Sequence, residues 1–315
     1  MTTTTTPWWT GTKPARFENI EIPERFGPFE IVVDERMVKN YAFAQDDPGA
    51  GALPVDGPPA AHPAVLSNEL LFLFYAAYDG NTAQGLHTRE DVSFHSPIRI
   101  GETVTIGGEY VETYVRRGKG YVVMEAQARG EDGRLLVRHR GTEIMHVHAA
   151  DVVGRATAPA PERLVTGEAR DVEPAVAASF DLPGRTPVSP VRKHISQEQM
   201  YVFSWGGRGF SNIHTDAAGA QRSGMDRTVA QAMQQVGYLS QMMTAFHGPS
   251  FVTDGALSVK FVRPFHVDDV VHARGAVLGP VDHDGERHLE TEVWVENEAG
   301  QKTAVGWAHA PVRGR

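Results

Sequence analysis

The sequence predicts an α+β fold in which one unit occurs twice, each unit being an antiparallel sheet that wraps a long central helix. Three observations predict this fold. A segment recurs at an offset of 167 residues, from Val92 to Val259. A helix that is apolar on most sides precedes each copy, which indicates burial on most sides. Strands with a period of two, separated by hairpin turns, follow each copy.

The repeat is clearest where segment 92–104 is compared with segment 259–271. The proline, the alternation of apolar residues and the acidic residue before the next strand all coincide. The same offset relates the tripeptide at 131–133 to that at 298–300, and both end in glycine, as hairpin turns often do. We therefore expect two copies of one unit, whose sheets join into a single continuous sheet with one shared interface.

Each unit presents its elements in the same order: a short helix, a long buried helix and then period-two strands. The first short helix is opened by Asp34 and the second by Ser196, both of which are residue types that cap helices. In the first unit we expect helices over 34–45 and 63–78, and strands over 121–128 and 135–145. In the second unit we expect helices over 196–205 and 228–246, and strands over 289–295 and 303–312.

These elements divide the chain into four parts. They are an N-terminal extension (1–28), an N-terminal repeat (29–151), a linker (152–190) and a C-terminal repeat (191–315). Prolines recur throughout the segment between the repeats, which is typical of a connection rather than of a core element.

The composition excludes several classes of function. The chain has no cysteine, so disulfides, thiolate zinc sites, iron–sulfur clusters and cysteine nucleophiles are excluded. A net charge of −9 argues against nucleic-acid binding. The first residues lack the pattern of a signal peptide, and the longest apolar run, 70–78, is shorter than the ~20 residues of a membrane helix. We expect a cytoplasmic protein without membrane partner, cofactor or metal. His146 and His148 are expected to be exposed at the surface rather than to bind a metal.

Several motifs resemble the MaoC-like double-hot-dog proteins, the R-specific enoyl-CoA hydratases and dehydratases. Segments 43–48, 58–63 and 94–104 are similar to the N-terminal half of these proteins. Segments 213–224 and 229–233 are similar to their C-terminal half, which is usually the catalytic one. The resemblance extends from about residue 29 to 312 and implies a double hot-dog fold.

The catalytic motif departs from the family pattern, which runs Asp-x-Asn-Pro-x-His. The corresponding residues are Gly209-Phe210-Ser211-Asn212-Ile213-His214, so the histidine is present and glycine replaces the aspartate. At the start of the long helix, where the family usually has His-Gly, this chain has Gln231-Ala232.

The resemblance implies roles for the remaining residues. His214 is the expected acid–base group, and the backbone N–H of Ala232 is the expected donor to a developing oxyanion. Ser211 and Asn212 either orient a hydroxyl or water, or cap the following helix. Asp47, together with His62, could replace the lost carboxylate from the other repeat. Alternatively, Asp47 is an ordinary turn residue and His62 is a residue at a helix start.

Candidates for substrate binding are Gly209, Trp205, Gln231, Ala232 and Tyr238, although Trp205 and Tyr238 are equally compatible with the core. The glycine-rich run 206–209 suggests a pocket widened for a bulky substrate.

Three functions remain open. The first is a lyase (hydratase or dehydratase) acting on a β-hydroxyacyl thioester or a bulky β-hydroxy carbonyl compound of polyketide or fatty acyl metabolism. The second is a hot-dog thioesterase in which Gln231 and Asn212 position water. The third is a catalytically degenerate homologue that binds acyl compounds or has a structural role. The substrate could be carried on CoA or acyl carrier protein, and a homodimer is possible.

Overall fold

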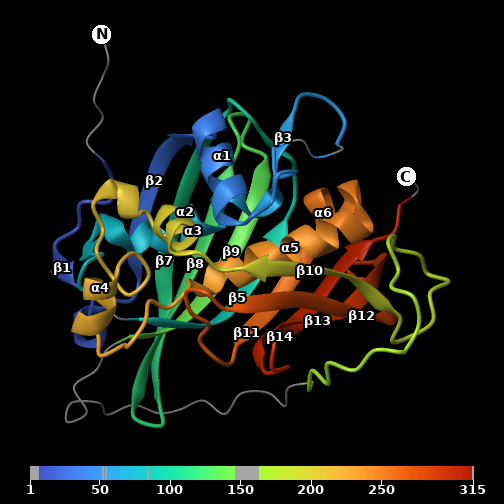
Figure 1. Ribbon diagram of the computed structural model, residues 1–315. Coiled ribbons are helices and arrows are strands. Elements are labelled where there is room, and N and C mark those ends of the chain that lie inside the picture. Colours follow the sequence, from blue (N-terminus) through green and yellow to red (C-terminus); the bar gives the residue numbers. More distant parts are fainter. Residues whose placement is uncertain (1–6, 52, 54, 84, 146–162, 314–315) are drawn as a thin grey trace.

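The computed structural model describes residues 7–51, 53, 55–83, 85–145 and 163–313. Its main element is one antiparallel sheet of ten strands, with the helices packed on one face (Figure 1). The predicted α+β double hot-dog architecture is confirmed, and the sheets of the two repeats join edge to edge as expected.

The sheet consists of five strands from each repeat, in the order β10-β12-β13-β14-β11-β5-β9-β8-β7-β2. The N-terminal repeat contributes β2 (Glu24–Val32), β5 (Leu86–Phe94), β7 (Thr103–Arg116), β8 (Lys119–Arg129) and β9 (Leu135–Met145). The C-terminal repeat contributes β10 (Pro187–His194), β11 (Ala256–Phe261), β12 (Val270–His283), β13 (Glu286–Asn297) and β14 (Lys302–Pro311). Two short two-stranded ladders join β1 (Lys13–Pro14) to β4 (Tyr78–Asp79) and β3 (Ala60–Ala61) to β6 (Ile98–Arg99).

The two repeats meet where β5 pairs with β11. In this ladder Asp91 lies opposite Ser258, its own counterpart at the offset of 167 residues. The Ser258 hydroxyl donates a hydrogen bond of 2.5 Å to Asp91 Oδ1. The same offset separates the bounds of β7 from those of β12. The pseudo-two-fold axis therefore passes through the β5–β11 ladder, and neither sheet half ends in an open edge at that point.

The helices of the C-terminal repeat lie close to their predicted positions. In α3 (Gln197–Phe203), Ser196 and Gln199 form a capping box. The long helix α5 (Ala232–His247) is buried along most of its length, and Figure 1 shows it lying across the sheet. Shorter helices are η4 (Gly206–Arg208), α4 (Ala217–Arg222), which Asp216 caps, and α6 (Pro249–Asp254).

The N-terminal repeat differs from the prediction in its central helix. α1 (Glu35–Ala44) is capped by Asp34 as expected, and η1 (Phe17–Asn19) precedes β2. Instead of one helix over 63–78, however, three short segments follow one another: η2 (Pro63–Leu66), α2 (Ser67–Leu71) and η3 (Phe72–Ala76). In a 3₁₀ segment side chains three residues apart eclipse, and the rings of Phe72 and Tyr75 are stacked at 4.5 Å. Aromatic stacking thus accompanies the tighter winding.

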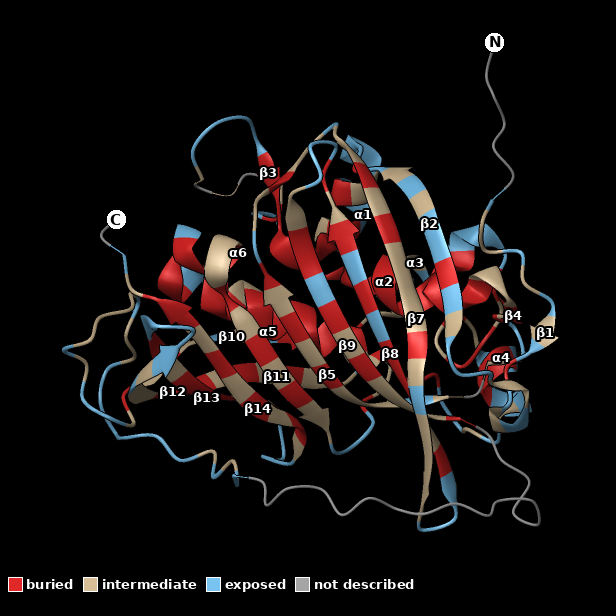
Figure 2. Ribbon diagram, turned by 180° about the vertical axis from the view of Figure 1, so that it is seen from behind, coloured by how far each residue is buried: buried red, intermediate tan, exposed pale blue. Residues whose placement is uncertain are grey.

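The predicted segment boundaries shift at two places. Strand β2 begins at Glu24, inside the segment assigned to an N-terminal extension, and β10 begins at Pro187, inside the assigned linker. The described part of the linker packs along the C-terminal repeat, because Gly167 N–H donates to the Glu292 carboxylate at 2.6 Å. Figure 2 shows buried and exposed residues alternating along the strands, so that one face of the sheet packs against the core. Within the described residues, no helix is both long and apolar enough to span a membrane.

Candidate functional site

A cavity of about 300 Å³ lies between the two repeats. One wall comes from the N-terminal repeat, through α2, η3 and the ends of β5 and β9. The other wall comes from the C-terminal repeat, through the loop before α4, the start of α5 and the segment after β11. The polar side chains on these walls belong to Tyr75, His87, Thr88, Glu143, Asn212, His214, Gln231, Gln235 and Arg263.

His214 is held in one orientation on the wall of this cavity. Its Nδ1 lies 2.7 Å from the carbonyl oxygen of Val229. A carbonyl can only accept, so Nδ1 carries the proton and Nε2 is left with the lone pair. The Asn212 side-chain oxygen accepts from the His214 backbone N–H at 3.0 Å, which fixes the backbone of the loop.

The environment of His214 keeps the imidazole neutral. Burial lowers the pKa of His214 to about 4, although the bond to Val229 acts in the opposite direction. At neutral pH the ring is therefore an acceptor of protons, and the group can act as a general base.

The amino end of α5 borders the same cavity. Gln231 is extended, with φ −68° and ψ 133°, and gives no side-chain cap to the helix that begins at Ala232. Both residues line the cavity. Because the first N–H groups of a helix lack intrahelical acceptors and carry partial positive charge, this end is suited to a ligand oxygen that becomes negative.

Some predicted site residues lie outside the cavity lining. Ser211 faces away, since its hydroxyl accepts a 2.8 Å bond from Arg222. Gly209 has a φ of +91° and open space around it, and none of the glycines at 206, 207 and 209 lines the cavity. Trp205 packs edge-on against Phe72 at 4.9 Å, behind the wall rather than in it.

The residues proposed as a second constellation, Asp47 and His62, are brought together elsewhere. The hydroxyl of Tyr41 lies 2.9 Å from His62 Nδ1. Burial raises the pKa of Asp47, against the charge of Lys193, and burial together with that charge lowers the pKa of His62. Neither residue lines the cavity of His214. Tyr238, another predicted substrate-binding residue, also lies in this neighbourhood, with Lys193 5.7 Å from the centre of its ring.

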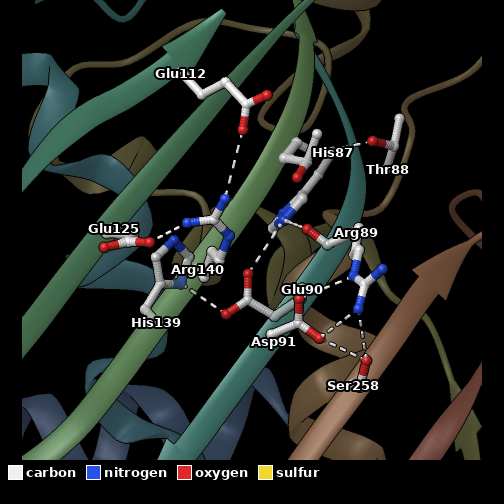
Figure 3. A network of polar contacts seen from close by, with 11 residues as sticks. His87, Thr88, Arg89, Glu90, Asp91, Glu112, Glu125, His139, Arg140 and Ser258 are labelled. Carbon is white, nitrogen blue, oxygen red and sulfur yellow. Dashed lines mark hydrogen bonds and ion pairs between the residues drawn. The ribbon is translucent and has the colours of Figure 1, made fainter. Parts of the chain in front are cut away.

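Sequence reasoning missed a polar cluster on the N-terminal wall. Glu90 is fully buried between His87, at 3.2 Å, and His139, at 2.7 Å (Figure 3). Burial alone would raise the pKa of Glu90, but the two imidazoles hold it below its ordinary value. Burial lowers the pKa of His87, but the bond to Glu90 and the negative charges of Glu90 and Glu143 together outweigh burial and raise it.

Glu143 extends this cluster to the cavity. It lies opposite His87 in the β5–β9 ladder, and both residues line the cavity. A signal was present in the sequence: His139 and Glu143 lie four residues apart in a predicted strand, on the face shared with Val137 and Met145. Polar residues on the apolar face of a strand mark a site or a buried network.

No metal site accompanies the cavity in the part of the chain that the structure describes, where no three His, Asp or Glu side chains are grouped as ligands. His146 and His148 lie outside the described residues.

Comparison with known proteins supports the fold. Residues 179–299 match the family model described as MaoC like domain. No curated protein matches the chain. One solved structure, described as a MaoC-like dehydratase, has a TM-score of 0.68 at 16% identity and covers 93% of this chain and 98% of its own.

Two further solved structures have the same fold. A conserved hypothetical protein from Mycobacterium tuberculosis, described as having a double hotdog fold, has a TM-score of 0.62 at 13% identity and covers 94% of this chain and 97% of its own. A MaoC-like dehydratase from Phytophthora capsici has a TM-score of 0.60 at 14% identity and covers 93% of this chain and 97% of its own. Residues 179–299 are thus similar to the MaoC like domain, and the chain has the double hot-dog fold.

Proposed function

We propose that the protein is a hydro-lyase that adds or removes water across a double bond conjugated to a thioester carbonyl. One observation carries the proposal: His214, with an available Nε2, and the amino end of α5 border the same cavity. The family match to residues 179–299 supports hydratase or dehydratase chemistry.

The proposed chemistry divides between the base and the helix end. In the dehydration direction Nε2 of His214 removes the proton on the carbon next to the thioester carbonyl. The electron pair moves towards the carbonyl, whose oxygen becomes negative and is stabilised by the Ala232 N–H. A preorganised donor aimed at such an oxygen is often the largest single contribution to catalysis. Asn212 acts as a positioning residue through the His214 backbone.

The cavity favours a compact acyl group. Its volume of about 300 Å³ lies at the lower end of the range for ligand pockets. The glycine run at 206–209, which suggested a bulky polyketide, does not line it. Arg263 lines the cavity and is exposed to solvent, which places a cation at the rim. The carriers CoA and acyl carrier protein both join a thiol to a phosphate, and a guanidinium is suited to binding that phosphate.

The test is hydration of a 2-enoyl-CoA such as crotonyl-CoA by wild-type protein and by His214→Ala. The variant should lose about 10²- to 10⁴-fold in kcat, the usual contribution of one general acid or base. Replacement of the exposed His194 by alanine serves as the matched control and should leave the rate unchanged. Equal rates for His214→Ala and wild type would refute the assignment.

Thioester hydrolysis is the second candidate, because the buried side chain of Gln231 lines the cavity and could position a water. The same incubation distinguishes the two reactions. Hydrolysis releases free CoA thiol, whereas hydration leaves the thioester intact.

A further inference from the structure

The cavity contains one carboxylate among its described lining residues, and that carboxylate comes from the N-terminal repeat. It belongs to Glu143 on β9, whereas the family motif would supply an aspartate at position 209 of the C-terminal repeat. Glu143 makes no hydrogen bond or ion pair within the described part of the chain. Gly85, on the neighbouring segment, also lines the cavity and lies beside Glu143.

The internal repeat provides a comparison within the same molecule. Strands β9 and β14 are counterparts, and the inward positions of β14 hold only small apolar residues or glycine. The counterpart of Glu143 is Ala310, that of His139 is Gly306, and on β11 the counterpart of Glu90 is Leu257. At these three positions the C-terminal repeat has an apolar residue or glycine where the N-terminal repeat has a polar one. The three polar residues lie on β5 and β9, the strands whose ends border the cavity of His214.

The groups that face Glu143 come from four elements. His87 and Glu90 lie on β5 and His139 lies on β9, and Glu143 also interacts electrostatically with Tyr75 of η3 and Tyr110 of β7. Burial raises the pKa of Glu143, while His87 and His139 oppose that shift. A carboxyl group with a raised pKa is suited to donate a proton near neutral pH.

We propose that Glu143 is the second catalytic residue of the cavity and protonates the leaving hydroxyl, while His214 removes the α-proton. This inference rests on the proposed hydro-lyase function. It assigns the two halves of the reaction to the two repeats, so that neither repeat has a complete site alone.

The step balances without any added reactant. The Cα–H bond breaks and its proton goes to His214 Nε2; the electron pair forms the Cα=Cβ bond. The Cβ–O bond breaks, its electrons remain on oxygen, and the proton from Glu143 completes a water molecule. The resulting imidazolium and carboxylate return to their starting forms by proton exchange with solvent. Hydration follows the same steps in reverse.

The His87–Glu90–His139 cluster holds the donor in place from behind. Gly141 makes the cluster possible, because a Cβ there would come within 2.9 Å of His139 Nε2 and 3.3 Å of His87 Nε2. Within the cluster, His87 and His139 oppose the rise that burial gives the pKa of Glu143, whereas Glu90 adds to that rise. These three residues are positioning residues in the proposal and Glu143 is the one that contacts substrate.

The experiment compares Glu143→Gln with His214→Ala on two substrates, 3-hydroxybutyryl-CoA and 3-chlorobutyryl-CoA. Chloride leaves without a proton, so elimination from the second substrate needs the base but no acid. Glu143→Gln should slow dehydration by about 10²- to 10⁴-fold and slow chloride elimination by less than about tenfold. His214→Ala should slow both reactions. Glu112→Gln, at an exposed glutamate of β7, is the matched control and should change neither.

Further measurements separate misfolding of a variant from failure of the Glu143 assignment and from failure of the proposed function. Thermal unfolding checks that Glu143→Gln is folded, and Glu143→Asp, which keeps the carboxylate but shortens the side chain, should give an intermediate rate. If wild type is active and His214→Ala is not, while Glu143→Gln keeps full dehydration or slows both substrates equally, this inference alone is overturned. If wild type converts neither substrate, the proposed function fails first.

Discussion

Replacing His62 by glutamine should remove a large part of the acid sensitivity of the fold. His62 is 1% exposed, and its Nδ1 accepts from the Ala64 N–H at 3.2 Å and meets the Tyr41 hydroxyl at 2.9 Å. Burial, with the charge of Lys193, lowers the pKa of His62 from 6.5 to about 3. Glutamine keeps an oxygen acceptor near these donors but cannot take up the proton.

The sign follows from the direction of that shift. Above pH 6.5 the imidazole is neutral in the folded and the unfolded chain, so it adds nothing to the pH dependence. Below pH 6.5 the unfolded chain binds a proton that the folded chain refuses, so the free energy of unfolding falls until pH reaches about 3. At pH 5 the pH lies about 1.5 units below the unfolded-state pKa of 6.5, so the free energy of unfolding is lower by about 2 kcal/mol.

Urea unfolding at pH 7 and pH 5 measures the effect in wild type and in His62→Gln. Other groups, such as His247 with a pKa lowered by burial to about 4, contribute to both proteins and cancel in the comparison. The loss of stability between the two pH values should be about 2 kcal/mol smaller in the variant. Losses that agree within about 0.5 kcal/mol would refute the assignment of a buried, neutral imidazole.

Two further variants test the limits of the site. Gly209→Asp restores the family residue, but at a φ of +91° and outside the cavity. The variant should lose about 1 kcal/mol of stability in thermal unfolding, and its kcat should change by less than about threefold. A large gain in kcat would contradict the placement of this residue. Arg263→Ala should raise KM for a CoA thioester about tenfold, one charge-assisted contact, with kcat almost unchanged; a fall in kcat alone would contradict a role in carrier binding.

Elements with strong local signals could be predicted from the sequence. The cap at Asp34, the capping box at Ser196 and the hairpin glycines fix boundaries through nearest neighbours, and strand β9 has the predicted bounds, 135–145. The repeat offset predicted the joined sheet because equivalent strands must lie at equivalent places. The central helix of the N-terminal repeat could not be predicted in detail, since its winding depends on how Phe72 and Tyr75 pack against the rest of the core.

Only one wall of the candidate site could be predicted from the sequence, and the reason is physical. The motif around His214 is local in sequence, so its place beside α5 follows from the family pattern. The opposite wall is not local: Glu143 and His87 reach the cavity through strand pairing and through the contact between the repeats. Asp47, which the sequence suggests as the replacement carboxylate, lies outside the lining of this cavity and interacts with Lys193.

The most direct test of a site shared between the two repeats compares the dehydration rate of the double variant His214→Ala/Glu143→Gln with the rates of the two single variants. When two residues act together in one step, removing either one costs almost as much rate as removing both. If His214 and Glu143 act in one step, the double variant should be slower than the slower single variant by no more than about threefold. Reductions that multiply, or a Glu143→Gln variant as fast as wild type, would contradict a site shared between the two repeats.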